Sequence, residues 1–241
     1  MGAPLKPTRR AFTALTGGAL SLAGVGRLRA EGPDDVDIQL ALAVDASGSV
    51  NAHRFELQKQ GYVSAFRDAQ IVRAITSGML GSVAVMMYQW TGPRMQVVVA
   101  PWTKIDDKAS CDKFADMIAV APRRLYGGGT SIAGALDYGA RVFKDSGFRS
   151  LRRVIDVSGD GVNSSGRPVS LARDEAVAAG VIINGLPILS LEYDLDDHYK
   201  TEVIGGPGSF MVPAKTFEAF ADAVRRKLIL EIAGRDILSA G

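Results

Sequence analysis

The chain has 241 residues, of which 47% are hydrophobic, and this length and composition suffice for one globular domain with a large core. Its net charge is +2, but residues 1–30 hold five of the 28 basic residues and no acidic residue. The remainder carries 23 basic and 26 acidic residues, a net charge of −3, which gives no electrostatic reason to expect nucleic-acid or anionic-membrane binding.

The first thirty residues look like a twin-arginine export signal. Arg9 and Arg10 precede a mildly apolar stretch over 13–25, and Ala30 offers a small residue for cleavage. A retained membrane anchor is the alternative interpretation, but the stretch is shorter than the roughly 20 residues that span a bilayer. We therefore expect residues 1–30 to direct export to the periplasm and residues 31–241 to form a single domain.

Hydrophobic periodicity predicts strands and helices that alternate along the rest of the chain. The expected elements, in chain order, are strand 37–44, helix 53–68, strands 82–88 and 96–100, helices 110–120 and 131–144, strand 153–158, helix 170–179, strand 181–189 and helix 216–232. The connection after residue 88 is too short for a parallel crossover, so the strand at 96–100 is expected to be antiparallel. The pattern predicts an α/β fold: a doubly wound, mostly parallel Rossmann-like sheet with an antiparallel edge strand and helices on both faces.

Oxygen-bearing side chains stand at the ends of two predicted strands and on a glycine-rich loop. Asp45, Ser47 and Ser49 follow the first strand, Asp160 follows the strand at 153–158, and Thr130 follows three glycines. Hydroxyl and carboxylate oxygens are the hard ligands that suit Mg²⁺ and similar cations. Each position also has a structural interpretation as a helix cap or a turn residue, but their joint placement favours a metal site.

This discontinuous pattern resembles the metal-ion-dependent adhesion site (MIDAS) of a von Willebrand factor A-type (VWA-like) domain, over roughly residues 36–234. The resemblance implies that Ser47, Ser49 and Thr130 bind the ion directly, whereas the two aspartates bind it directly or through water. It further implies that the strands ending at Asp45 and near Asp160 are neighbours at the point where the winding reverses. The expected ion is Mg²⁺, with Mn²⁺ or Ca²⁺ as alternatives. Segments 154–161, 183–188 and 203–208 also resemble an uncharacterised family of exported proteobacterial proteins with this fold.

The function that the resemblance implies is a periplasmic, metal-dependent protein-binding module, in which an acidic group of an unknown protein partner completes the coordination of the ion. No catalytic residue and no stable membrane span are expected. A metal-assisted hydrolase or phosphotransferase is one alternative, but no phosphate-loop lysine follows the glycines and no general base is evident. A structural assembly subunit with a vestigial site is the other.

Four further residues receive structural interpretations. Asp156, inside a predicted strand, is expected to be a buried carboxylate hydrogen-bonded to backbone or hydroxyl groups. Cys111, the single cysteine, is expected to be a partly buried, inert thiol at a helix start. His53 and His198 are expected on the surface, because neither has a recognisable nucleophile near it in the sequence.

Overall fold

The structure, a computed structural model, describes residues 1–2, 34–192 and 194–233, so the predicted export signal lies almost entirely outside the described residues. A five-stranded sheet forms the centre of the domain, in the order β4-β3-β2-β6-β7. Its strands are β2 (Ile38–Asp45), β3 (Val83–Trp90), β4 (Gln96–Ile105), β6 (Arg153–Gly159) and β7 (Val181–Pro187). Only β4 pairs in antiparallel fashion among these strands, and this confirms the predicted α/β fold with an antiparallel edge.

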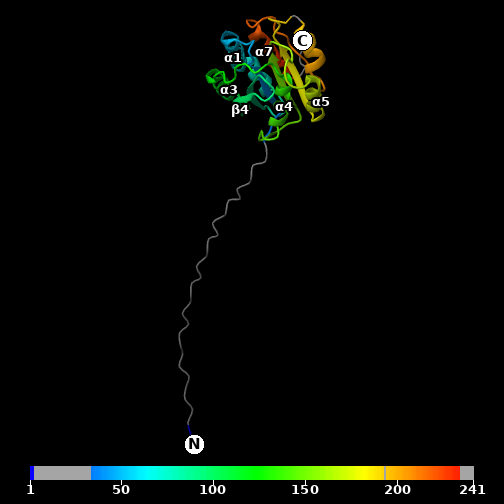
Figure 1. Ribbon diagram of the computed structural model, residues 1–241. Helices are drawn as coiled ribbons and strands as arrows, with labels where there is room; N and C mark the ends of the chain where they lie inside the picture. Colours follow the sequence, from blue (N-terminus) through cyan, green and yellow to red (C-terminus); the bar gives the residue numbers. More distant parts are fainter. Residues whose placement is uncertain (3–33, 193, 234–241) are drawn as a thin grey trace. The chain divides into compact units, whose positions relative to one another are not determined.

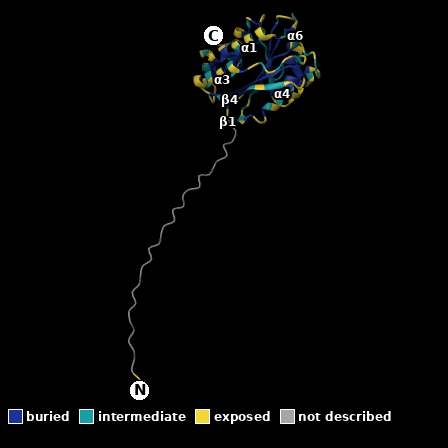
Figure 2. Cartoon of the chain, turned by 60° about the vertical axis from the view of Figure 1, so that its left-hand side comes forward, coloured by how far each residue is buried: buried dark blue, intermediate teal, exposed yellow. Residues whose placement is uncertain are grey.

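Helices cover both faces of the sheet (Figure 1). The helices on one face are α1 (Ala52–Arg67), α2 (Ala69–Thr76), α3 (Lys108–Val120) and α7 (Phe220–Ala233). The other face is covered by α4 (Ile132–Val142) and α5 (Val169–Ala178). The sheet is therefore buried between two layers, as Figure 2 shows by the dark blue of the central strands.

The alternation of side chains along β2 feeds two separate cores. Ile38, Leu40 and Leu42 face α1 and α7, whereas Ala41 and Ala43 face α4. The contact with α4 is close, because a Cβ atom on Gly139 of that helix would lie 2.6 Å from the hydroxyl of Tyr88. Continuous apolar strands of this kind are typical of a parallel sheet that is covered on both sides.

Several elements differ from the prediction. The structure adds the short parallel pair β1 (Asp34–Asp35) and β5 (Phe148–Arg149), the helix α2, and the π-helical turn η1 (Tyr199–Val203). This turn follows the short helix α6 (Leu195–His198), where the sequence of residues 194–200 favours a helix start. The strand β4 is longer than predicted, and α7 begins at Phe220 instead of residue 216. Ala221 is exposed near the start of α7, whereas the buried side of this helix includes Lys227 and Glu231.

Asp156 is buried as predicted, but its partner is a lysine and not a backbone or hydroxyl group. Its Oδ1 atom lies 2.6 Å from Nζ of Lys227, which also lies 3.2 Å from Oε2 of Glu231. Asn184, the neighbour of Asp156 on β7, donates a hydrogen bond of 2.7 Å to Glu231. The sequence pattern did not reveal that α7 turns two charged residues, Lys227 and Glu231, toward the sheet.

None of the helices within residues 34–192 and 194–233 combines the length and the apolar character that a membrane crossing requires.

Candidate metal centre

The candidate site lies at the carboxyl ends of β2 and β6. These strands are parallel neighbours, with Val44 opposite Ser158, so Asp45 and Asp160 emerge at the same edge of the sheet. The connection from β2 to β3 runs through α1 and α2 on one face, and the connection from β6 to β7 runs through α5 on the other. The winding direction therefore reverses between β2 and β6, and such a switch point is where open α/β sheets bind ligands.

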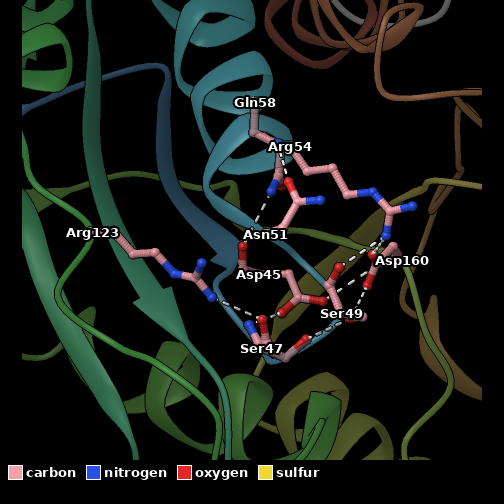
Figure 3. A network of polar contacts seen from close by, with 8 residues as sticks. All are labelled: Asp45, Ser47, Ser49, Asn51, Arg54, Gln58, Arg123 and Asp160. Carbon is pink, nitrogen blue, oxygen red and sulfur yellow. Dashed lines mark hydrogen bonds and ion pairs between the residues drawn. The ribbon is translucent and has the colours of Figure 1, made fainter.

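Four of the five predicted ligands form one hydrogen-bonded network (Figure 3). Oδ1 of Asp45 accepts a 2.7 Å hydrogen bond from the backbone N–H of Ser47, and its Oδ2 lies 3.4 Å from the N–H of Asp160. The hydroxyls of Ser47 and Ser49 are 3.1 Å apart. The Ser49 hydroxyl also donates a 2.5 Å hydrogen bond to Oδ1 of Asp160. Carboxylate and hydroxyl oxygens from two strand ends thus converge.

Thr130, the fifth predicted ligand, reaches this edge through its backbone. Its carbonyl accepts hydrogen bonds of 2.9 and 3.0 Å from the N–H groups of Ser164 and Ser165, in the loop that follows Asp160. Within the described part of the chain its hydroxyl makes no hydrogen bond to the other four residues. The structure therefore places Thr130 beside the network without joining its side chain to it.

The glycine-rich loop allows this approach. Gly127, Gly128 and Gly129 have φ values of 67°, 89° and 84°, a left-handed conformation that side chains disfavour. A Cβ atom on Gly129 would also lie 2.8 Å from the hydroxyl of Ser165. The loop is also joined to the sheet. The backbone N–H of Ser131, two residues after Gly129, donates a hydrogen bond of 2.8 Å to the carbonyl of Thr91, which directly follows β3.

Both carboxylates are withdrawn from water. Asp45 is 0% exposed and Asp160 is 1% exposed. Burial raises the pKa of Asp45 to about 7, with the hydrogen bond from Ser47 opposing the rise and the Asp160 carboxylate adding to it. Burial likewise raises the pKa of Asp160, while the Ser49 hydroxyl and the Arg54 guanidinium oppose it. Buried carboxylates of this kind are stabilised by a cation.

The residues present fit a hard divalent cation. Every candidate ligand offers oxygen, the donor that Mg²⁺, Mn²⁺ and Ca²⁺ prefer. Oδ2 of Asp160 is buried and has no hydrogen-bond partner among the described residues. The same is true of the nearby hydroxyl of Tyr199. A buried polar atom without a partner is uncommon and calls for a missing ligand or water.

Two arginines at the site were not predicted. Nη1 of Arg54 donates a 2.9 Å hydrogen bond to the carbonyl of Ser49 and lies 3.7 Å from Oδ2 of Asp160. Nη2 of Arg123 donates to the carbonyls of Ala46 and Ser47 at 2.9 and 3.0 Å. The position of Arg54 in the first turn of the helix after Ser49 was a usable signal. The irregular segment that holds Arg123 gave none.

His198 is half-buried, which corrects its prediction as a surface residue, whereas His53 is exposed as expected. Nε2 of His198 accepts a 3.3 Å hydrogen bond from the N–H of Asn163. Burial lowers the pKa of His198, which favours the neutral ring that this acceptor role requires. This hydrogen bond ties His198 to the loop that follows Asp160.

Cys111 is fully buried in α3, more deeply than predicted. Burial raises the pKa of its thiol to about 11, so the thiol stays protonated near neutral pH. The prediction of an inert thiol is consistent with both observations.

A comparison with protein families finds one match, over residues 35–236, to a family described as "Protein of unknown function (DUF1194)". No curated protein matches the chain. The match covers the sheet, its helices and all five predicted ligands.

Solved structures of VWA domains share the fold. Proximal thread matrix protein 1 from the mussel byssus matches with a TM-score of 0.62 and 15% identity, over 83% of this chain and 49% of that chain. A von Willebrand factor type A protein from Catenulispora acidiphila matches with a TM-score of 0.57 and 13% identity, over 82% and 43%. The chain thus spans about half the length of these proteins or less. The VWA-like fold expected from the sequence is confirmed.

A third match is the vWF domain of the type V pili tip protein Mfa5 from Porphyromonas gingivalis, with a TM-score of 0.55 and 9% identity, over 82% of this chain and 96% of that chain. Another crystal structure of the mussel protein is described as having a "zinc occupied MIDAS motif". At these identities the likeness concerns the fold, and the chemistry of the site rests on this chain's own residues.

Proposed function

This chain belongs to the DUF1194 family and has a VWA-like fold, and from that premise we propose that it is a metal-dependent protein-binding module. The observation that carries the proposal is the network of Asp45, Ser47, Ser49 and Asp160 at the switch point of the sheet, in which Oδ2 of Asp160 is buried and accepts no hydrogen bond from the described residues. A divalent ion held there would offset the charge of two buried carboxylates.

The ion would be held by the hydroxyls of Ser47, Ser49 and Thr130 and by the carboxylates of Asp45 and Asp160. Mg²⁺ is the proposed ion, with Mn²⁺ or Ca²⁺ as alternatives, because all five side chains offer oxygen. The zinc in the mussel protein supports a divalent ion in a site of this class and does not select among metals. When bound, the ion would supply a positive centre that attracts an anionic group.

The partner proposed here is a protein that presents an acidic side chain to the ion. Two guanidinium groups beside the network, those of Arg54 and Arg123, favour a negatively charged partner. The exposed ring of Tyr126 lies with its centre 4.8 Å from Cζ of Arg123, and this ring offers a partner an apolar contact next to that guanidinium. The occurrence of the fold in a pilus tip protein supports an adhesive role.

We propose binding instead of catalysis, and export to the periplasm under the direction of Arg9 and Arg10. A metal-assisted hydrolase would turn over members of a phosphoester panel in the presence of Mg²⁺ or Mn²⁺. Turnover that Asp45→Ala abolishes would replace the binding proposal with an enzymatic one.

The proposed function is tested by capture of partners on immobilised protein in Mg²⁺ and in EDTA, beside a folded Asp45→Ala/Thr130→Ala variant. We expect a protein that binds in Mg²⁺, elutes in EDTA and is competed by free aspartate, and that the variant fails to retain. Partners held equally in EDTA and by the variant would favour a structural assembly subunit.

A further inference from the structure

Arg54 is fixed beside the candidate metal centre by three kinds of contact. Its backbone N–H is capped by the Asn51 side chain at 2.9 Å, which sets the first turn of α1 (Figure 3). Its guanidinium donates 2.9 Å to the carbonyl of Ser49 and lies over the ring of Phe217, 5.1 Å from the ring centre. These contacts hold the guanidinium, and with it the positive charge, in one position beside the site.

The guanidinium lies next to the Asp160 carboxylate but donates no hydrogen bond to it. Nη1 of Arg54 lies 3.7 Å from Oδ2 of Asp160, beyond hydrogen-bond distance, and that oxygen keeps no hydrogen-bond partner in the described chain. The Arg54 side chain is 26% exposed and that of Asp160 is 0% exposed. Screening by solvent between such partly and fully buried charges is weaker than at an open surface.

The charges near the site do not balance with an ion alone. Asp45 and Asp160 supply two negative charges when ionised, and a divalent ion neutralises both. The Arg54 charge then remains, 3.7 Å from Oδ2 of Asp160, and the Arg123 guanidinium adds a second positive charge beside the network. The acidic neighbour that Arg54 also acts on, Glu218, is exposed, so water screens it. A carboxylate from a partner would reduce this surplus of positive charge.

We propose that Arg54 is a resident cation that weakens binding of the metal ion alone and makes the ion and a partner's carboxylate bind cooperatively. This rests on the proposed function and adds its regulation: the site is filled in full only when a partner is present. Because the coupling is a free energy shared by two ligands, each must tighten the binding of the other by the same factor.

The test is a calorimetric titration of Mn²⁺ into the purified protein and its Arg54→Gln variant, in sodium chloride and in sodium acetate at equal ionic strength. Arg54→Gln should bind Mn²⁺ about threefold to tenfold more tightly than the parent in chloride, because a nearby like charge is gone. Arg54→Lys, which keeps the charge, should stay near the parent. Acetate should tighten Mn²⁺ binding by the parent more than by Arg54→Gln.

The matched control is Arg67→Gln, the same change on the same helix, where the side chain pairs with Asp116 far from the ion site. It should bind Mn²⁺ as the parent does, and circular dichroism should show all variants folded. Equal Mn²⁺ affinity in the parent and in Arg54→Gln would overturn the role of Arg54 while leaving the metal site intact. Absence of Mn²⁺ binding in both proteins would overturn the proposed function as well.

Discussion

Gly159 is the residue that lets the Asp45 carboxylate reach the end of β6. A Cβ atom at this position would lie 3.0 Å from Oδ2 of Asp45 and 3.0 Å from the hydroxyl of Tyr199. Gly161, two residues later, has open space by comparison, since its nearest neighbours would be 3.8 and 3.9 Å away. One glycine is thus required by the site's geometry and the other is not.

Replacement of Gly159 by alanine should displace the Asp45 side chain and reduce Mn²⁺ affinity by about tenfold or more, with a loss of stability of about 1–3 kcal/mol from overpacking. Gly161→Ala should leave both quantities near those of the parent. Mn²⁺ titration and urea unfolding check the pair. Equal Mn²⁺ affinities for the two variants would show that the position of Asp45 does not matter for the ion.

For single residues, the sequence predicted which oxygen-bearing side chains lie together at the site, but not which charged side chains surround them. Asp45, Ser47, Ser49 and Asp160 follow strands whose apolar runs are plain in the sequence, so their convergence follows from parallel pairing. Arg123 reaches the carbonyls of Ala46 and Ser47 from an irregular segment, whose path depends on tertiary contacts. The partner of Asp156 was missed because a lysine within a helix is ordinarily exposed.

The helix α7 is joined to the sheet by a buried ionic cluster as well as by apolar packing. Lys227 and Glu231 are both 0% exposed and face Asp156 of β6 and Asn184 of β7. Burial raises the pKa values of Asp156 and Glu231, and the Lys227 ammonium opposes the rise for each. One lysine between two carboxylates is therefore the element that makes this burial tolerable.

Lys227→Met should destabilise the protein by about 3–5 kcal/mol, because it leaves two buried carboxyl groups without their cation. Lys108→Met, which removes an exposed pair with Asp112 on α3, should cost less than about 1 kcal/mol. Chemical denaturation at neutral pH measures both. A loss below 1 kcal/mol for Lys227→Met would mean that the cluster contributes little to holding α7.

The long elements, whose hydrophobic periodicity is clear in the sequence, were predicted. The short elements, which depend on tertiary contacts, were not. The strands β2, β3, β6 and β7 and the helices α1, α3, α4 and α5 lie within a few residues of their expected bounds. The helix α2 was missed because it starts directly after α1, with Asp68 serving both as the end of one helix and the cap of the next. The pair of β1 and β5 has two residues per strand, too few for a periodic signal.

For the molecule as a whole, three segments far apart in sequence build one candidate site because the fold brings their loops to one sheet edge. The loops after β2 and β6 and the glycine-rich loop before α4 supply the five oxygen-bearing side chains. The VWA-like structures share this fold, and the family match over residues 35–236 includes all three loops.

Export is expected to depend on the paired arginines near the start of the chain. Arg9→Lys/Arg10→Lys should abolish periplasmic accumulation, because twin-arginine signals are read by a receptor that requires both guanidinium groups. Arg27→Lys/Arg29→Lys, with the same loss of two guanidinium groups, should be exported normally. Cell fractionation followed by immunoblotting distinguishes them, and unchanged accumulation of the first variant would contradict this route.

The central claim is that the oxygen cluster binds a divalent ion, and calorimetric titration of Mg²⁺ and Mn²⁺ into the purified protein tests it most directly. The parent should bind one ion saturably, and a folded Asp45→Ala/Thr130→Ala variant should not, because a carboxylate and a hydroxyl ligand are lost. Absence of binding by the parent, or equal binding by the variant, would contradict the account and favour a structural subunit whose site is vestigial.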